Sequence, residues 1–218
     1  MNTSFIEFLA RNEAIRFGEF TLKSGRESPY FIDMGVLTTG TTISELGKYY
    51  AAKIRDHFNE DFDVIFGPAY KAVPIAVSAA MQFGNKRWLF DRKEKKLHGA
   101  DANSTFVGSQ NLDLGSRVVI VDDVITTGGT KIEAIEKLST IIKADILGIV
   151  IAVDRMEIGK KNSAIEEFSE LSGINVFAIE NIDNIFNYLK DNKVDGKSYV
   201  NNKTFERYQK YIKTYGSF

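Results

Sequence analysis

The alternation of short apolar runs with amphipathic stretches over residues 41–180 is the feature that most constrains the fold. Apolar, β-branched runs such as 117–121 are typical of strands that are covered on both faces of a sheet. Stretches such as 41–58 repeat apolar residues at helical spacing. This alternation predicts an α/β fold, with a mainly parallel sheet, flanking helices and right-handed crossovers.

The same patterns give the boundaries of the expected elements. Strands are expected at 15–22, 29–34, 64–67, 87–90, 117–121, 145–153 and 175–179. Helices are expected at 3–13, with Ser4 as N-cap, and at 41–58, 72–83, 129–142, 163–172, 182–189 and 203–214. Residues 91–109 are polar and lack periodicity, which predicts a long loop. No linker-like segment divides the sequence, so we expect one domain, 1–218.

Charge and composition exclude several classes of protein. The formal net charge of −1 gives no field that would attract nucleic acid or a membrane surface. The absence of cysteine excludes disulfides and thiolate metal sites. No signal peptide or membrane-spanning run is apparent, so a cytoplasmic protein is expected.

The segment VVIVDDVITTGGT at 118–130 carries the strongest chemical signal. A buried strand ends in two carboxylates, Asp122 and Asp123, which suit ribose hydroxyls and a hydrated Mg²⁺. A loop of threonines and glycines follows and leads into a helix: Thr126, Thr127, Gly128, Gly129 and Thr130. The N-terminus of a helix after such a loop can bind phosphate. Together these groups predict a ribose 5-phosphate site, although the spacing alone also allows an ordinary surface turn. The segment is neither a Walker A loop nor a dinucleotide fingerprint.

The segment closely resembles the motif with which type I phosphoribosyltransferases bind 5-phosphoribosyl 1-diphosphate (PRPP). Four further blocks resemble those of the orotate phosphoribosyltransferases: FGEFTLKSGRESPYFID at 17–33, GPAYKAVPIA at 67–76, FDRKEKKLHG at 90–99 and AVDRMEIG at 152–159. The resemblance implies the type I phosphoribosyltransferase fold, with a small hood formed mainly by about residues 1–38. It also implies transfer of ribose 5-phosphate from PRPP to orotate, giving orotidine 5′-phosphate and pyrophosphate in pyrimidine (UMP) biosynthesis.

The resemblance assigns roles to individual residues. The residues implied to bind PRPP are Lys23, Tyr70, Lys71, Arg92, Lys93, Lys96, His98, Asp122, Asp123, Val124, Ile125 and the loop Thr126, Thr127, Gly128, Gly129 and Thr130. Those implied in catalysis are Lys96, His98, Asp122 and Asp123, and those implied to bind orotate are Phe31, Ile32, Thr126 and Arg155. Mg²⁺ is the expected cofactor, carried by PRPP or pyrophosphate without a direct protein ligand, or through water to the two acids.

Two of these residues also have a chemical argument of their own. Arg155 follows a strand end, where its guanidinium could pair with the orotate carboxylate or with ring carbonyls, or else form an ordinary ion pair. Thr126 stands where purine phosphoribosyltransferases usually carry an Asp that handles a proton of the purine, and a Thr cannot act as that base.

The resemblance also implies a homodimer in which the loop at 91–109 closes over the neighbouring subunit's site. Two alternatives stay open in the sequence: a phosphoribosyltransferase for another base, and a PRPP-binding regulator without catalytic activity. The absence of a DNA-binding extension and the retained basic loop speak against the regulator.

Overall fold

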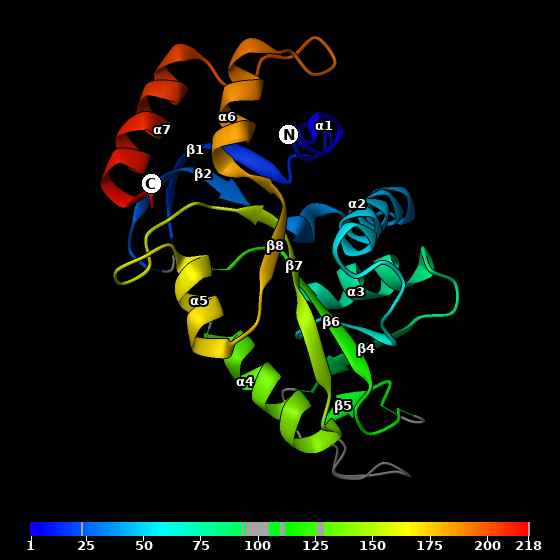
Figure 1. Ribbon diagram of the computed structural model, residues 1–218. Helices are drawn as coiled ribbons and strands as arrows, with labels where there is room; N and C mark the ends of the chain where they lie inside the picture. The colour runs from blue at the N-terminus through cyan, green and yellow to red at the C-terminus, as the bar shows by residue number, and fades with distance from the viewer. Residues whose placement is uncertain (23, 93, 95–104, 110–111, 126–128, 218) are drawn as a thin grey trace.

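The computed structural model describes residues 1–22, 24–92, 94, 105–109, 112–125 and 129–217. Within them, a sheet of six strands occupies the centre of the molecule in the order β5-β4-β3-β6-β7-β8 (Figure 1). Its strands are β3 (Val64–Phe66), β4 (Arg87–Asp91), β5 (Phe106–Val107), β6 (Arg117–Asp122), β7 (Asp145–Asp154) and β8 (Val176–Asn181). Every neighbouring pair is parallel except β4 and β5, which confirms the predicted α/β fold.

Helices cover both faces of this sheet (Figure 1). One face carries α2 (Gly40–Phe58) and α3 (Ala72–Met81), and the other carries α4 (Gly129–Lys137) and α5 (Ala164–Ser172). Strand β6 supplies side chains to the cores on both sides: Val119 and Val121 to the first, Val118 and Ile120 to the second. A strand buried on both faces has no polar alternation, which is why this one reads as a continuous apolar run.

The hairpin of β1 (Ile15–Thr21) and β2 (Glu27–Ile32) forms a separate antiparallel sheet. Three helices pack around it at the top of Figure 1: α1 (Thr3–Arg11), α6 (Ile182–Asp191) and α7 (Asn202–Tyr215). The ring of Phe186 in α6 meets Phe17 of β1 edge-on at 5.2 Å and stacks on Tyr208 of α7 at 3.9 Å between centroids. The hood expected mainly from about residues 1–38 therefore shares its core with the last two helices.

The N-cap of α1 is Asn2, so the expectation of Ser4 was wrong. The side-chain oxygen of Asn2 accepts the backbone N–H of Phe5 at 3.1 Å, and the Ser4 hydroxyl donates to that same oxygen at 2.9 Å. Both residue types cap helices well, so residue type could not decide between two positions so close together.

Two further element boundaries differ from the sequence expectation. Phe106 and Val107 lie inside the stretch expected to be a loop, yet they pair with β4 as the short edge strand β5. Phe106 is 2% exposed and packs against Phe66, with 6.2 Å between ring centroids. Two residues are too few to show a period, so this strand depends on tertiary packing. Helix α4 ends at Lys137 and continues as a π-helical turn, Leu138–Ile142.

Candidate active site

The carboxyl ends of the parallel strands lie at one edge of the sheet, where open α/β sheets bind their ligands. The structure places predicted site residues at four of these ends. Lys71 comes after β3, and Arg92 follows β4. Asp122 ends β6, with Asp123 directly after it, and Arg155 follows β7.

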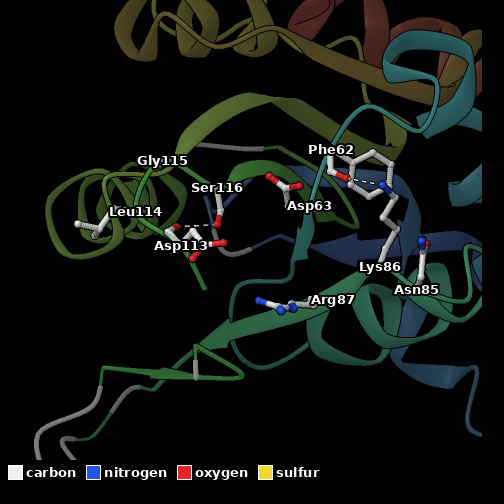
Figure 2. Close-up of a pocket in the computed structure, with 9 residues that line it drawn as sticks. All are labelled: Phe62, Asp63, Asn85, Lys86, Arg87, Asp113, Leu114, Gly115 and Ser116. Carbon is white, nitrogen blue, oxygen red and sulfur yellow. Dashed lines mark hydrogen bonds between the residues drawn. The ribbon is translucent and has the colours of Figure 1, made fainter. Parts of the chain in front are cut away.

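A hollow of about 360 Å³ lies at the opposite edge of the sheet (Figure 2). Its lining residues precede the strands, with Asp63 before β3, Lys86 before β4 and Ser116 before β6. Figure 2 shows that Lys86 donates to the carbonyl of Phe62 and Ser116 to that of Asp113. Because these donors are satisfied within the protein and lie at the amino ends of the strands, we place the site at the other edge.

The Asp122 carboxylate is held inside the protein. Its Oδ2 lies 2.7 Å from Lys131 Nζ, and the two side chains are 13% and 11% exposed. Its Oδ1 accepts the backbone N–H of Asp123 at 2.8 Å. Lys131 also donates to the carbonyl of Val124 at 2.8 Å, and the Tyr50 hydroxyl donates to the carbonyl of Asp122 at 2.7 Å. A cation of the protein therefore already neutralises this acid.

Asp123 differs from its neighbour, because no described residue forms an ion pair with it. Its Oδ1 accepts the backbone N–H of Val124 at 2.7 Å, and its carbonyl accepts the N–H of Ala152 in β7 at 3.0 Å. Burial, followed by repulsion from Asp122, raises the pKa of Asp123 to about 6. This carboxyl group is thus the member of the pair that is better suited to hydrogen-bond the hydroxyls of a sugar.

Val124 and Ile125 anchor the loop that leaves β6. Val124 packs against the core beneath α2, and Ile125, which is 4% exposed, belongs to the core beneath α4. Since the Ile125 side chain is buried and that of Val124 is packed on the core, these two residues can offer a phosphate only their main chain. Gly129 begins α4, with Thr130 next, so a helix N-terminus follows the loop as phosphate binding requires.

The turn between β3 and α3 depends on Gly67. A Cβ at this position would lie 2.3 Å from the carbonyl oxygen of Ala72, so no larger residue fits without moving the backbone. Tyr70, later in the same turn, is 64% exposed.

Lys71 joins this turn to the hairpin. Its Nζ donates to Asp33 Oδ1, just after β2, at 3.0 Å. The hydrogen bond with Asp33, reinforced by the charges of Asp123 and Asp122, raises the pKa of Lys71. Lys71 is therefore a firmly protonated cation within electrostatic range of the acid pair, as a pyrophosphate-binding residue should be.

Arg92 follows β4, and its backbone N–H donates to the carbonyl of Thr105 at 2.7 Å. Its Nε is buried and has no hydrogen-bond partner among the described residues. A buried guanidinium nitrogen without a partner is costly, which favours an anionic ligand as its partner. The preceding residue, Asp91, accepts the N–H of Ala69 at 2.8 Å and ties this strand end to the turn after β3.

Arg155 lies in a buried ion pair. It is 6% exposed, and its Nε and Nη2 donate to Glu157 Oε1 at 2.9 and 2.6 Å. Its guanidinium carbon lies 4.5 Å from the centroid of the Tyr30 ring. The hydrogen bonds to Glu157 use Nε and Nη2, so the ion pair that the sequence allowed leaves the Nη1 amino group outside it.

The two hairpin residues expected to meet the base differ in burial. Phe31 is partly exposed, lies 5.6 Å from Phe20 between ring centroids, and is covered by the Arg16 guanidinium at 5.4 Å. Ile32 is 6% exposed and belongs to the core. The side chain of Phe31 can therefore meet a planar ligand, whereas Ile32 has only its main chain to offer.

The remaining predicted site residues lie outside the described part of the chain: Lys23, Lys93, Lys96, His98, Thr126, Thr127 and Gly128. Their roles, including catalysis by Lys96 and His98, stay predictions.

Sequence reasoning missed Lys131 and Glu157, which hold Asp122 and Arg155 in place. The sequence position of each residue could have suggested this role. Lys131 lies in the first turn of the helix that follows the acids, and Glu157 is two residues after the arginine that it holds. Charges this close to a strand end are candidate partners for the site residues.

The carboxylates of Asp122 and Asp123 fit a magnesium ion that is bound mainly by the phosphates of a ligand. No group of three or more His, Cys, Asp or Glu that could hold a metal is found in the described ranges. Mg²⁺ binds carboxylate oxygens and phosphates and keeps several of its waters. Asp122 is already paired with Lys131, which leaves Asp123 as the acid that would hold a water of the ion.

Comparisons with known proteins show the family to which the chain belongs. The model of the phosphoribosyl transferase domain matches residues 36–180. The orotate phosphoribosyltransferase of Agathobacter rectalis is 38% identical over 98% of this chain and 97% of its own length. That of Vibrio cholerae is 43% identical over 85% of this chain and 87% of its own.

Solved structures extend the similarity to the fold. The crystal structure of orotate phosphoribosyltransferase from Francisella tularensis covers 98% of this chain and 100% of its own, with a TM-score of 0.80 and 35% identity. Among the described residues, no helix combines the length and apolar character needed to cross a membrane.

Proposed function

Since this chain belongs to the orotate phosphoribosyltransferases, which carry the phosphoribosyl transferase domain, we propose that its site transfers ribose 5-phosphate from PRPP to orotate. The products are orotidine 5′-phosphate and pyrophosphate, a step of pyrimidine biosynthesis. The observation that carries the proposal is the acid pair Asp122–Asp123 at the carboxyl end of β6, followed by the N-terminus of α4.

The reaction breaks the bond between C1′ of PRPP and the pyrophosphate oxygen and forms a bond from C1′ to a ring nitrogen of orotate. Positive charge develops on the ribose while the pyrophosphate leaves with the bonding electrons, so catalysis requires stabilisation at both ends. Lys71 and Arg92 are the described cations that suit the pyrophosphate, and Lys93, Lys96 and His98 are proposed to complete that group.

The acids act on the sugar. Asp123 is proposed to accept hydrogen bonds from the ribose hydroxyls and to add negative potential near C1′. Asp122, whose charge is balanced by Lys131, is proposed to hold the backbone of Asp123 in place. The main chain of the loop from Val124 to Thr130 and the N-terminus of α4 are proposed to bind the 5′-phosphate. Mg²⁺, when bound, neutralises part of the charge on the departing pyrophosphate.

The base would lie between the hairpin and the end of β7. Arg155 is proposed to pair through its Nη1 amino group with the carboxylate or a carbonyl of orotate. Phe31 is proposed to cover the ring face, with the main chain of Ile32 and the side chain of Thr126 at the ring edge.

A homodimer with shared sites, which rests on the family resemblance, and a cytoplasmic location complete the proposal. Mixing inactive subunits tests the shared site.

A panel of bases tests the reaction. The purified protein is incubated with PRPP, Mg²⁺ and either orotate, uracil, hypoxanthine or adenine, and consumption of the base is followed by absorbance. We expect turnover of orotate that depends on both PRPP and Mg²⁺. Turnover of another base but not of orotate would overturn the substrate assignment, and PRPP binding without any turnover would indicate the regulator.

A further inference from the structure

Four side chains, three of them from distant parts of the chain, converge on the carboxylate of Glu157, which is 10% exposed. Its Oε1 accepts hydrogen bonds from Nε and Nη2 of Arg155 at 2.9 and 2.6 Å, from the Tyr211 hydroxyl at 2.7 Å and from the Tyr30 hydroxyl at 3.2 Å. Its Oε2 accepts Nη1 of Arg26 at 3.2 Å. The hairpin, the end of β7 and helix α7 therefore meet at one acidic group.

The backbone around Glu157 is fixed as well. Ile158 donates its N–H to the carbonyl of Tyr215 at 2.7 Å, and Ser217 donates to the carbonyl of Met156 at 2.9 Å. Glu157 and Gly216 form an antiparallel bridge between these two hydrogen bonds. Residues 215–217 thus run beside the segment that follows Arg155 and fix its backbone by hydrogen bonds.

We propose that Glu157 is a positioning residue, which orients the Arg155 guanidinium toward the base with the support of Tyr211. The inference rests on the proposed role of Arg155 in binding orotate. Both donors on one edge of the guanidinium go to Glu157, and its face lies on the Tyr30 ring. The plane of the guanidinium is therefore fixed before a ligand arrives, and preorganised donors bind with less loss of conformational entropy.

Two cations, Arg155 and Arg26, pair with the single carboxylate of Glu157. The hydrogen bonds from the tyrosines stabilise the carboxylate without adding charge. Burial, followed by the hydrogen bond to Glu157, raises the pKa of Tyr211 to about 12, so its hydroxyl remains a donor at neutral pH.

The test compares steady-state constants of the full-length enzyme for both substrates. Glu157→Gln keeps the size of the side chain but loses its charge, and Tyr211→Phe removes a single hydroxyl. We expect Glu157→Gln to raise the KM for orotate roughly tenfold, the loss typical of a charged hydrogen bond. Tyr211→Phe should raise it only about threefold, because Tyr211 acts on the arginine through Glu157. The KM for PRPP should change less than about twofold.

Tyr208→Phe is the matched control. It removes a tyrosine hydroxyl from the same helix, one that donates to a different carboxylate, Asp183, at 3.2 Å. Its KM for orotate should equal that of the wild type. If Tyr211→Phe and Tyr208→Phe behave alike, or if both substrates and kcat are affected equally, Glu157 has only a structural role and the inference is wrong.

Arg155→Ala separates this inference from the proposed function. If Arg155→Ala leaves the KM for orotate unchanged, the proposed role of Arg155 fails, whatever Glu157 does. If it raises that KM while Glu157→Gln and Tyr211→Phe leave it unchanged or lower it, only the positioning role fails. In the double variant Arg155→Ala/Glu157→Gln, the KM for orotate should match that of Arg155→Ala, because Glu157 acts through the arginine. Should Glu157→Gln fail to fold, Tyr211→Phe alone decides.

Discussion

Lys131 Nζ lies 2.7 Å from Asp122 Oδ2, and both side chains are nearly buried. The two adjacent acids of the motif are therefore not equivalent. Asp122 is paired with a lysine of the following helix, whereas Asp123 has no ion-pair partner among the described residues and carries the raised pKa. Sequence adjacency conceals this division of roles, since it depends on which carboxylate the first turn of α4 reaches.

Replacing Lys131 by Met should destabilise the protein by about 3 kcal/mol, because it leaves the Asp122 carboxylate buried without a counter-charge. Urea unfolding at neutral pH measures the loss. Adding Asp122→Asn to Lys131→Met should recover part of it, since the unpaired charge is then removed as well. A double variant no more stable than Lys131→Met alone would contradict this account.

The control for Lys131→Met is Glu60→Gln. This substitution breaks the ion pair between Glu60 and Arg55, whose side chains are 58% and 44% exposed respectively. An exposed pair contributes little, so the loss of stability should stay below about 1 kcal/mol.

The stability of Asp123→Asn relative to the wild type should depend on pH. The pKa of Asp123 is about 6 in the folded protein and 3.8 for the free side chain, so folding favours the protonated acid. The stability that Asp123 contributes is complete below pH 3.8 and is lost as the pH rises through 6.

Asparagine does not titrate in this range, so Asp123→Asn should gain stability relative to the wild type as the pH rises from about 4 to about 7. The expected gain is about 2 kcal/mol. Urea unfolding of both proteins at several pH values gives the difference, and parallel curves would show that the pKa of Asp123 is not raised.

Lys96→Ala should slow turnover far more than it weakens orotate binding, if Lys96 acts on the leaving pyrophosphate. Steady-state kcat and the Kd for orotate, measured by calorimetry, separate the two effects. An equal loss in both would show that the lysine is mainly a binding group.

Mixing inactive subunits tests the shared site. If the loop at 91–109 closes over the partner, Lys96→Ala chains mixed with Arg155→Ala chains should regain some activity, because one of the two sites in a mixed dimer is then intact. Each variant mixed with itself is the control. Failure to regain activity, with subunit exchange verified by mass, would argue against sites built from two subunits.

Gly67→Ala should destabilise the fold by about 3 kcal/mol, since the new methyl group would lie 2.3 Å from the Ala72 carbonyl oxygen and 2.9 Å from the Ala76 methyl group. Gly40→Ala is the control, because a Cβ there meets nothing within 4 Å. That variant should be neutral or slightly stabilising. Thermal unfolding of both variants provides the comparison, and equal midpoints would contradict the steric argument.

The fold was predictable from local patterns. Strands β6 and β7 are long, apolar and β-branched, and the helices between strands have clear periodicity, so their positions were predicted within a few residues. Strand β5 was not, because its two residues become a strand only through pairing with β4. The prediction of the N-cap of α1 was wrong because Asn2 and Ser4 can both cap a helix, and only the three-dimensional geometry decides between them.

The site was predictable as a set of residues but not as a network. Asp122, Asp123, Lys71 and Arg155 were identified by their places after strands and by resemblance. Their partners were not, because Asp33 reaches Lys71 from the hairpin and Tyr211 reaches Glu157 from the last helix. Contacts between residues so far apart in the chain leave no local pattern.

The hood that carries Phe31 is built from both ends of the chain. The ring of Phe17 meets that of Phe186 in α6, and the ring of Tyr30 meets that of Tyr211 in α7 edge-on. During synthesis, the hairpin leaves the ribosome long before α6 and α7 exist, so it has to wait for its packing partners. The base-binding half of the site, which includes Phe31, therefore cannot be complete until α6 and α7 have been synthesised.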